Sequence, residues 1–262
     1  MNRVVILSGV LAATLAAGFV RAAPAAAASG LDSPRAKDVA MRLVSSAENS
    51  TLNWRGQYGY IEDIGDGRGY TGGIIGFCSG TSDMLTVVRR YAARRPGSPL
   101  AAYVPALEKV DGTASHAGLG PGFVAAWKNA ARDPVFRAAQ DEERDRAYFD
   151  PAVRQAKADG LRALGQFIYY DAIVMHGPGD DRASFGAIRA TAMKRARTPA
   201  QGGNETAYLD AFLTARRAAM RTETTDTSRV DTEQLAFLRA GNLDLVLPLT
   251  WKTYGSRYTI TR

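Results

Sequence analysis

Two carboxylate residues, Glu48 and Asp66, lie eighteen positions apart and flank a surface rich in glycine and aromatic residues. Glu48 follows apolar residues at helical spacing, so we expect it at the C-terminal end of a helix, where the helix dipole favours a protonated carboxyl. Asp66 lies between two glycines in a predicted turn. One protonated and one ionised carboxyl beside a bound sugar would supply the acid and the base of a glycosidase.

Each carboxylate also has an ordinary structural explanation. A solvated Glu can lie at a frayed helix end, and Asp-Gly in a hairpin is common turn chemistry. The aromatic residues Trp54, Tyr58, Tyr60 and Tyr70 could stack on sugar rings or fill a helix–sheet interface equally well. The hypothesis of catalysis therefore depends on the two carboxylates together.

Other motifs of the same segment lack their structural context. Gly67 to Gly72 matches a dinucleotide fingerprint but follows no apolar strand and opens no helix. The run from Asp63 resembles a calcium loop, but its twelfth position is Ile74 rather than a bidentate Glu. Cys78 is the only cysteine, which excludes an intrachain disulfide and favours a small buried residue. We expect neither a cofactor nor a metal.

The elements that must position these residues are mainly helices. A capping residue precedes proline at four predicted helix starts: Ser33-Pro34, Ser98-Pro99, Asp133-Pro134 and Asp150-Pro151. The first helix is predicted to run to about Glu48. Further helices are predicted from Thr81 or Ser82 to Pro96, from Asp150 to Met175 with a stop at Gly177-Pro178, and near 182–196, 204–222 and 231–240.

The segment from Thr51 to Gly80 departs from this helical pattern. It holds nine of the 26 glycines, with hairpin signals at Asp66-Gly67 and Gly72-Gly73 between short extended runs. So much glycine gives little core and costs folding entropy. A small glycine-rich sheet beside a ligand-binding cleft is the predicted arrangement.

The N-terminal segment has the pattern of a secretory signal peptide. Arg3 precedes an apolar run from Val4 to Ala17, and an alanine-rich stretch around Arg21 offers cleavage sites. We therefore expect residues 1–29 to be removed, a secreted product, and a catalytic domain over 30–262. No other apolar run is long enough to span a bilayer, so no membrane association is expected after cleavage.

The chain is basic, with a formal charge of +7. Removing Arg3 and Arg21 from its 33 basic residues leaves an excess of five over the 26 acidic residues. Such a balance is typical of proteins that bind polyanions. The densest basic cluster (Arg89, Arg90, Arg94 and Arg95) lies on one predicted helix, however, and a solvated helix face explains it better than a nucleic-acid partner.

Long blocks of the sequence resemble chitosanases of glycoside hydrolase family 46, of the actinobacterial type. The blocks are Ser45 to Ser50, Tyr60 to Phe77, Tyr148 to Val153, Ala163 to Phe167, Tyr170 to Gly177 and Thr198 to Gly203. The resemblance covers essentially the whole chain after the signal segment. It implies a mainly helical, two-lobed, lysozyme-like fold with the cleft between the lobes.

The resemblance also implies roles for individual residues. Glu48 matches the general acid, Asp66 the base that activates water, and Thr71 a residue that helps to hold this water. Arg68 matches an arginine that keeps the base ionised. The sugar-contacting positions match Asn49, Tyr60, Asp83 and His176, and Glu223 matches a further acid of the cleft. Asp171, Arg216 and Arg229 match an ion network that joins the lobes.

The expected function is therefore inverting hydrolysis of β-1,4 linkages inside chitosan, by a monomer. Two alternatives remain open from the sequence. A peptidoglycan hydrolase would share the lysozyme-like arrangement and suit a basic exported protein. A non-catalytic carbohydrate- or polyanion-binding protein would leave the combination of Glu48, Asp66 and Thr71 unexplained.

Overall fold

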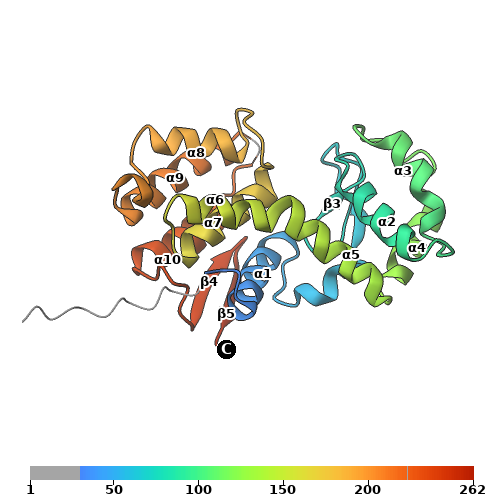
Figure 1. Ribbon diagram of the computed structural model, residues 1–262, viewed down its shortest axis with the longest axis horizontal. Coiled ribbons are helices and arrows are strands. Elements are labelled where there is room, and N and C mark those ends of the chain that lie inside the picture. Colours follow the sequence, from blue (N-terminus) through green and yellow to red (C-terminus); the bar gives the residue numbers. More distant parts are fainter. Residues whose placement is uncertain (1–29, 223) are drawn as a thin grey trace, which may run out of the picture.

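The computed structural model describes residues 30–222 and 224–262, and the predicted signal peptide at residues 1–29 lies outside this part of the chain. The described chain is mainly helical and forms two lobes, as predicted (Figure 1). The larger lobe contains the first helix, the C-terminal half of the chain and a C-terminal hairpin. The smaller lobe contains a three-stranded sheet and the helices that follow it.

Most helices belong to the larger lobe. Its elements are α1 (Pro34–Glu48), α6 (Asp150–Ala158), α7 (Ala163–His176), α8 (Phe185–Met193), the 3-10 turn η4 (Pro199–Gln201), α9 (Glu205–Met220), the π-helical segment η5 (Arg229–Gln234), α10 (Leu235–Arg239), β4 (Leu249–Thr253) and β5 (Ser256–Ile260). The central helix α7 is apolar over most of its length, and its residues from Ala163 to Ile173 are buried. Helices α8 and α9 cover one side of it (Figure 1).

The smaller lobe is built around the glycine-rich segment. Its elements are the 3-10 helix η1 (Trp54–Gly59), β1 (Ile61–Asp63), β2 (Tyr70–Gly72), β3 (Phe77–Cys78), α2 (Asp83–Arg94), η2 (Ala101–Tyr103), α3 (Val104–Val110) and α4 (Pro121–Ala130). The strands pair antiparallel in the order β1-β2-β3, with Thr71 opposite Glu62 on one side and Cys78 on the other. This confirms the small sheet predicted for residues 51–80.

One long helical run spans both lobes. It consists of α5 (Pro134–Arg144), the π-helical segment η3 (Asp145–Phe149) and α6, and crosses the molecule in Figure 1. The start at Asp133 is confirmed, because its carboxylate accepts a bond of 2.8 Å from the Val135 N–H. Helix α6 does begin at Asp150, as predicted, but Asp150 is its first residue rather than its cap, and α6 continues from η3 without a break. The Asp150 N–H reaches the Asp145 carbonyl five residues back, and this wider turn carries the chain past a proline that has no N–H.

Two other helix predictions need correction. The helix predicted from Asp150 to Met175 is two helices, because Gly160 takes a left-handed conformation (φ +79°) and the Leu161 N–H closes the end of α6 on the Ala156 carbonyl. Ser98-Pro99 begins a turn that leads into η2 rather than an α-helix. Helix α4, which begins at Pro121, was not predicted.

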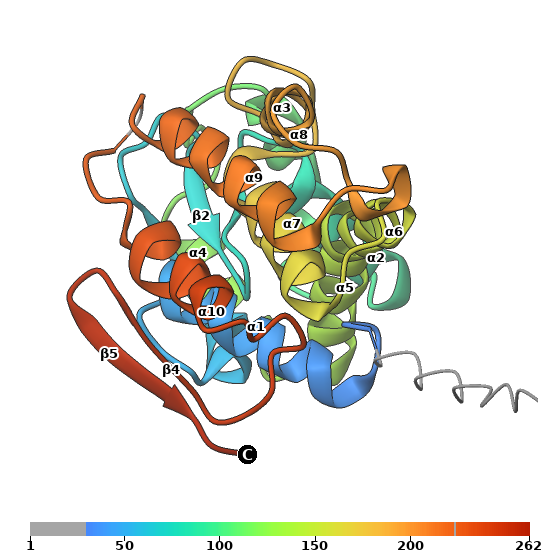
Figure 2. The ribbon, with the colours of Figure 1, turned by 90° about the vertical axis from the view of Figure 1, so that its left-hand side faces the viewer.

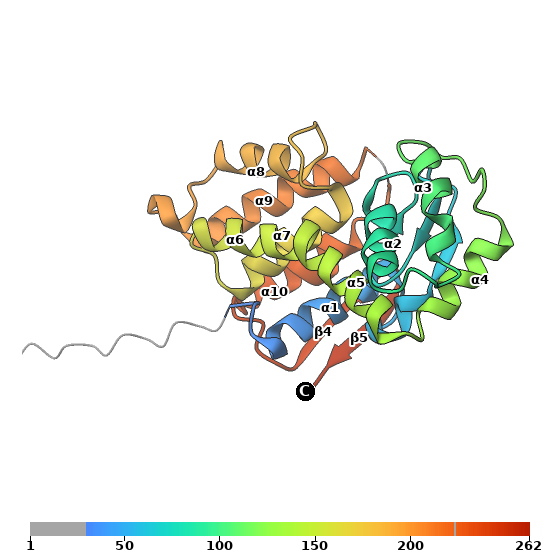
Figure 3. The same cartoon turned by 45° about the vertical axis from the view of Figure 1, so that its right-hand side comes forward.

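A C-terminal hairpin completes the larger lobe. Strands β4 and β5 pair antiparallel beside α1 and α10 (Figure 2), and the Trp251 indole donates to the Ser46 hydroxyl of α1. Figure 3 shows the smaller lobe beside the helices of the larger one. Within the described residues, no helix is long and apolar enough to span a bilayer.

Candidate active site

A polar hollow of about 420 Å³, the central hollow, lies where the two lobes meet. The larger lobe supplies Ala47, Glu48, Asn49, Val174, Met175, Arg229 and Tyr254 to its lining, and the smaller lobe supplies Tyr60, Glu62, Ile64, Arg68, Thr71, Ile75 and Gly76. A second hollow of about 440 Å³ shares Arg68, Ile75, Gly76, Val174 and Met175 with the first. The two hollows therefore form one continuous cleft.

Glu48 is the last residue of α1, as the sequence predicted. Pro34 lies in the first turn of this helix, and the Ser33 hydroxyl caps it by accepting from the Ala36 N–H. The Glu48 side chain is 25% exposed, and its Oε1 accepts a hydrogen bond of 2.6 Å from Nη1 of Arg229. Its Oε2 has no hydrogen-bond partner among the residues that the structure describes.

Arg229 connects Glu48 to a buried ion network. Asp171 of α7 lies between two arginines, 2.6 Å from Nη2 of Arg229 and 2.7 Å from Nη1 of Arg216. Gln234 donates a further bond of 2.6 Å to the same carboxylate. The predicted trio of Asp171, Arg216 and Arg229 therefore does come together. All its members belong to the larger lobe, so the network ends at the cleft and does not join the lobes.

The charges in this network compensate one another. Burial alone would raise the pKa of Asp171, but Arg229 and Arg216 hold it well below its usual range through their charges and hydrogen bonds. The side chains of the three ions are at most 3% exposed. Removing one partner would leave a buried charge uncompensated, which is far more costly than losing a surface pair.

Asp66 lies on the loop between β1 and β2, and its contacts are local. Its Oδ1 accepts from the Arg68 N–H at 3.0 Å, and its Oδ2 lies 2.8 Å from Nε of the same guanidinium. Burial lowers the pKa of Arg68, but the hydrogen bond that Arg68 donates to Asp66 and the more distant charge of Glu48 raise it overall. Arg68 lines both hollows, whereas Asp66 lies behind it and is not among the residues that line them.

Thr71, at the centre of β2, presents its side chain to the central hollow. Its Oγ1 lies 3.4 Å from Sγ of Cys78 on the neighbouring strand. Cys78 is buried, as predicted, and burial raises the pKa of its thiol. The neutral thiol is therefore favoured, and Cys78 has no feature of a nucleophile.

The other sugar-contacting candidates are divided between the two hollows. Asn49 and Tyr60 line the central hollow, and the Tyr60 hydroxyl donates to Glu62. Asp83 and His176 line the second hollow. Glu223 lies outside the described residues, so its predicted place in the cleft stays a prediction.

Asp83 differs most from its predicted role. It is 7% exposed, and its carboxylate accepts from the N–H groups of Cys78 and Met84 and from the hydroxyls of Thr81 and Tyr148, at 2.6–2.9 Å. Burial raises its pKa, and these donors oppose the shift. Asp83 therefore fixes the start of α2 against β3 and the Tyr148 side chain. Its contact with sugar stays a prediction.

His176, the last residue of α7, is neutral over the usual pH range. Burial, followed by the charges of Arg216 and Arg229, lowers its pKa to about 3. Neither ring nitrogen has a hydrogen-bond partner among the described residues. The ring lines the second hollow, but both of its nitrogens are shielded from solvent.

Sequence reasoning missed several residues of the site. Glu233 and Gln234 point inward from η5, and Glu233 Oε2 accepts from the Thr253 hydroxyl at 2.9 Å. A buried Glu inside a helical pattern cannot be distinguished from a surface Glu by sequence alone. Tyr254 had a usable signal, because Tyr254-Gly255 separates two runs of alternating apolar residues, as in a hairpin.

Outside the cleft, the structure explains the basic helix. Arg89, Arg94 and Arg95 pair with Glu108, Glu142 and Asp133, and Arg90 pairs with Glu143, at 2.6–3.3 Å. The predicted solvated helix face therefore carries neutralised charges. No group of three His, Cys, Asp or Glu residues in the described ranges is arranged to hold a metal ion.

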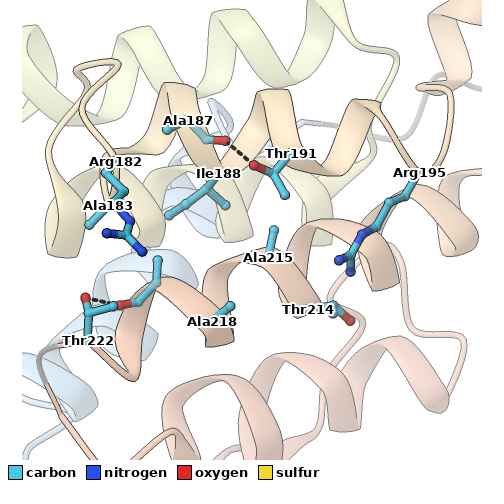
Figure 4. Close-up of a pocket in the computed structure, with 11 residues that line it drawn as sticks. Arg182, Ala183, Ala187, Ile188, Thr191, Arg195, Thr214, Ala215, Ala218 and Thr222 are labelled. Atoms are coloured by element: carbon cyan, nitrogen blue, oxygen red, sulfur yellow. Dashed lines mark hydrogen bonds between the residues drawn. The ribbon is translucent and has the colours of Figure 1, made fainter.

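A further hollow of about 430 Å³ lies between α8 and α9 (Figure 4). Its floor consists of small side chains, and the hydroxyls of Thr191 and Thr222 are bonded to carbonyls of their own helical segments. Arg182 and Arg195 lie at its edges. None of the described residues that line it is a carboxylate, so it lacks the acid–base pair of the cleft.

Comparisons with known proteins agree with this geometry. The family model for glycosyl hydrolase family 46 matches residues 42–249. A chitosanase of Streptomyces sp. (strain N174) is 70% identical over 236 residues, which cover 89% of this chain and 85% of the relative. A chitosanase of Nocardioides sp. (strain N106) is 63% identical over 253 residues, covering 94% and 91% of the two chains.

Solved structures show the same fold. The co-crystal structure of chitosanase OU01 with substrate superposes with a TM-score of 0.88 at 60% sequence identity, and the match covers 90% of this chain and all of that one. The family model spans most of the described chain, including Glu48 and Asp66. This chain is therefore a glycoside hydrolase that belongs to family 46.

Proposed function

We propose that this glycoside hydrolase cleaves β-1,4 linkages inside chitosan by an inverting mechanism. The observation that carries the proposal is the placement of Glu48 at one wall of an extended cleft and of the Asp66–Arg68 pair at the opposite lobe. Its relatives among chitosanases, which are up to 70% identical, support the substrate.

Carboxylates and arginines both line the cleft. Glu48 and Glu62 line the central hollow together with Arg68 and Arg229, and Asp83 and Glu143 line the second one together with Arg68 and Arg146. The formal charges of each lining therefore balance, and the chitosanase relatives support the substrate more strongly than the charge of the cleft does.

In the proposed reaction, protonated Glu48 donates its proton to the glycosidic oxygen as the bond from this oxygen to the anomeric carbon breaks. The Oε2 atom is suited to carry this proton, because Oε1 already accepts from Arg229. Glu48 becomes a carboxylate during the step. Arg229, held by Asp171, stabilises the negative charge as it develops.

Asp66 acts as the base on the opposite face of the sugar. It takes a proton from the water whose oxygen bonds to the anomeric carbon, while the Thr71 hydroxyl helps to hold this water. The Arg68 guanidinium, 2.8 Å from Asp66 through its Nε atom, orients the carboxylate by a charge-assisted hydrogen bond. Inversion then gives a new reducing end in the α configuration.

We further propose that residues 1–29 direct export and that the enzyme acts outside the cell as a monomer. Both lobes of the cleft come from one chain, so the site needs no residue of a second copy. N-terminal sequencing of protein from the culture medium tests the cleavage. Size-exclusion chromatography with light scattering tests the oligomeric state.

The decisive test uses the glucosamine hexamer with wild type and Glu48→Gln. Wild type should release shorter oligomers whose first anomeric proton signals, recorded before mutarotation, are α. Glu48→Gln should lose nearly all turnover while its free energy of unfolding stays within about 1 kcal/mol of wild type. Early β product would contradict the role of Asp66. Degradation of highly N-acetylated substrate instead would favour the peptidoglycan alternative.

A further inference from the structure

Exposed apolar side chains are concentrated at the cleft. Within residues 30–222 and 224–262, the large hydrophobic side chains that are exposed are Ile64 (49%), Tyr254 (44%) and Val246 (64%). Two of these three, Ile64 and Tyr254, line the hollow that contains Glu48. Single exposed apolar side chains are common on protein surfaces, so the argument depends on the fact that these two residues line one hollow.

The two residues come from opposite lobes. Ile64 follows β1 of the smaller lobe and begins the loop that carries Asp66. Tyr254 lies at the tip of the β4–β5 hairpin of the larger lobe, which is seen beside α1 and α10 in Figure 2. A ligand in the central hollow therefore has an apolar side chain on each lobe and carboxylates along its edges.

The backbone of Tyr254 is unusual for an aromatic residue. Thr253 and Ser256 are paired, and the two residues between them have positive φ angles, +50° at Tyr254 and +79° at Gly255. Such two-residue turns favour Asn, Asp or Gly at the first position, and a bulky residue there is strained. The Tyr254 N–H donates to the Ser228 hydroxyl at 2.8 Å, which fixes the turn. Strain of this kind is typical of functional positions.

The surroundings of Tyr254 tie it to the acid. Partial burial raises the pKa of its hydroxyl, the charge of Arg229 opposes the shift, and the charge of Glu48 adds to it. The phenol is therefore neutral, and its ring lies near the end of the ion network that contacts Glu48. Tyr254 and Glu48 line the same hollow, which a substrate unit that receives the proton has to enter.

We propose that Tyr254 and Ile64 are sugar-contacting residues that hold one glucosamine ring between them beside Glu48. In a β-linked glucosamine unit the ring substituents are equatorial, so both faces of the ring carry C–H groups while the hydroxyl and ammonium groups lie around its edge. Apolar side chains suit the faces, and the electron-rich face of a tyrosine also attracts a cation. The inference rests on the proposed function, because it assumes a glucosamine chain in this cleft.

Binding of the glucosamine hexamer, measured by calorimetry in the Glu48→Gln background, tests the inference without hydrolysis. Adding Tyr254→Asn should weaken binding about tenfold, Ile64→Ser should weaken it severalfold, and Tyr254→Phe should stay within twofold. Val246→Ser is the matched control, because it removes a more exposed apolar side chain that does not line the cleft. Its affinity should equal that of the parent.

The Asn variant separates ligand contact from a structural role. Asn adopts a positive φ more easily than Tyr does, so Tyr254→Asn should unfold at the same temperature as its parent or higher. In the active enzyme it should raise KM about tenfold and change kcat less than threefold. Unchanged hexamer affinity in Tyr254→Asn, or an equal loss in Val246→Ser, would overturn the inference. The proposed function is judged separately, by hydrolysis of chitosan by wild type.

Discussion

The two candidate catalytic carboxylates, Glu48 and Asp66, are held in opposite ways. Glu48 ends a buried helix and bonds to Arg229, which belongs to a network of ions brought together from α7, α9 and η5. Asp66 bonds to Arg68, two residues farther along the same loop. The acid is therefore positioned by tertiary structure, and the base by local backbone conformation.

Because of this difference, we expect substitutions in the two lobes to have different main effects. Changes in the network behind Glu48 should affect folding first, because they uncover buried charge. Changes around Asp66 should affect the reaction first, because a hypothetical Cβ at Gly65 or Gly67 would meet nothing within 4 Å. Each prediction below tests one side of this contrast.

The largest expected effect is that of Asp66→Asn. An amide cannot take the proton from water, so the rate of chitosan hydrolysis should fall by about 10²–10⁴-fold. The free energy of unfolding should change by less than about 1 kcal/mol, since Asn keeps an acceptor for the Arg68 N–H. Asp63→Asn at the end of β1 is the control, and it should remain active. More than a tenth of wild-type activity in Asp66→Asn would refute the assignment of the base.

Asp171→Ala should have the opposite signature. It leaves the guanidinium groups of Arg216 and Arg229 buried without their anion, which costs about 3–5 kcal/mol of unfolding free energy. Glu108→Ala, which breaks the exposed pair with Arg89, should cost less than about 1 kcal/mol. Urea unfolding of both variants measures the difference, and equal losses of unfolding free energy would contradict the contrast between the two carboxylates.

The same network predicts how wild type responds to acid. Because the pKa of Asp171 is lowered in the native state, the unfolded chain takes up this proton first as the pH falls. The stabilisation is complete above the pKa of a free Asp, about 3.9, and is lost progressively below it. Asp171→Ala should lack this part of the acid dependence.

The contrast also explains what the sequence could predict. Local signals were reliable where local structure decides: the proline-started helix that ends at Glu48, and the glycine turns around Asp66. They failed where a distant contact decides. The helix predicted from Asp150 to Met175 breaks at Gly160, and the π-helical segment before Asp150 lets the chain continue through Pro151. The bond from Arg229 to Glu48 spans 181 positions, and no spacing rule reaches that far.

Roles that depend on burial could not be predicted from the sequence either. Asp83 looks like any acidic residue at a helix start, yet four donors surround its carboxylate. Glu233 belongs to a predicted helix, and its burial follows from the π-helical segment, which turns Arg229, Glu233 and Gln234 toward the same interior. Family resemblance found the catalytic candidates because it carries information about the folded state that periodicity lacks.

Glu233 gives a test of the larger lobe that depends on pH. Burial, and then the charge of Asp171, raise its pKa to about 8, although the Thr253 hydroxyl, Arg229 and Arg216 oppose the shift. Between about pH 4.5, the ordinary value, and pH 8, the native state holds a proton that the unfolded chain has released. The contribution of Glu233 to the free energy of unfolding therefore falls as the pH rises, by at most about 1.4 kcal/mol per pH unit.

Glu233→Gln should remove this slope, because the amide is neutral at every pH. Relative to wild type, the variant should gain about 1–3 kcal/mol of unfolding free energy between pH 5 and pH 8. Urea unfolding at pH 5, 6.5 and 8 measures the difference. Glu108→Gln on the surface of α3 should show no such trend, and a parallel trend in both variants would refute a buried protonated Glu233.

Gly67→Ala, with a small expected effect on stability, tests the other side of the contrast. Gly67 has φ +81°, and an added Cβ would meet nothing within 4 Å, so the cost is confined to backbone strain of about 1 kcal/mol. The loop can relieve this strain by moving, and Asp66 moves with it. Since a small displacement of a catalytic group is costly, hydrolysis should fall about tenfold.

Gly112→Ala is the matched control for this last variant. Gly112 has φ +77° and equally open surroundings in the same lobe, but it does not adjoin Asp66. Both variants should lose similar unfolding free energy, and only Gly67→Ala should lose activity. If the two variants hydrolyse chitosan equally well, the local backbone does not position the base. Asp66 would then have to be held by contacts with bound sugar, and the contrast between the lobes would apply only to the free enzyme.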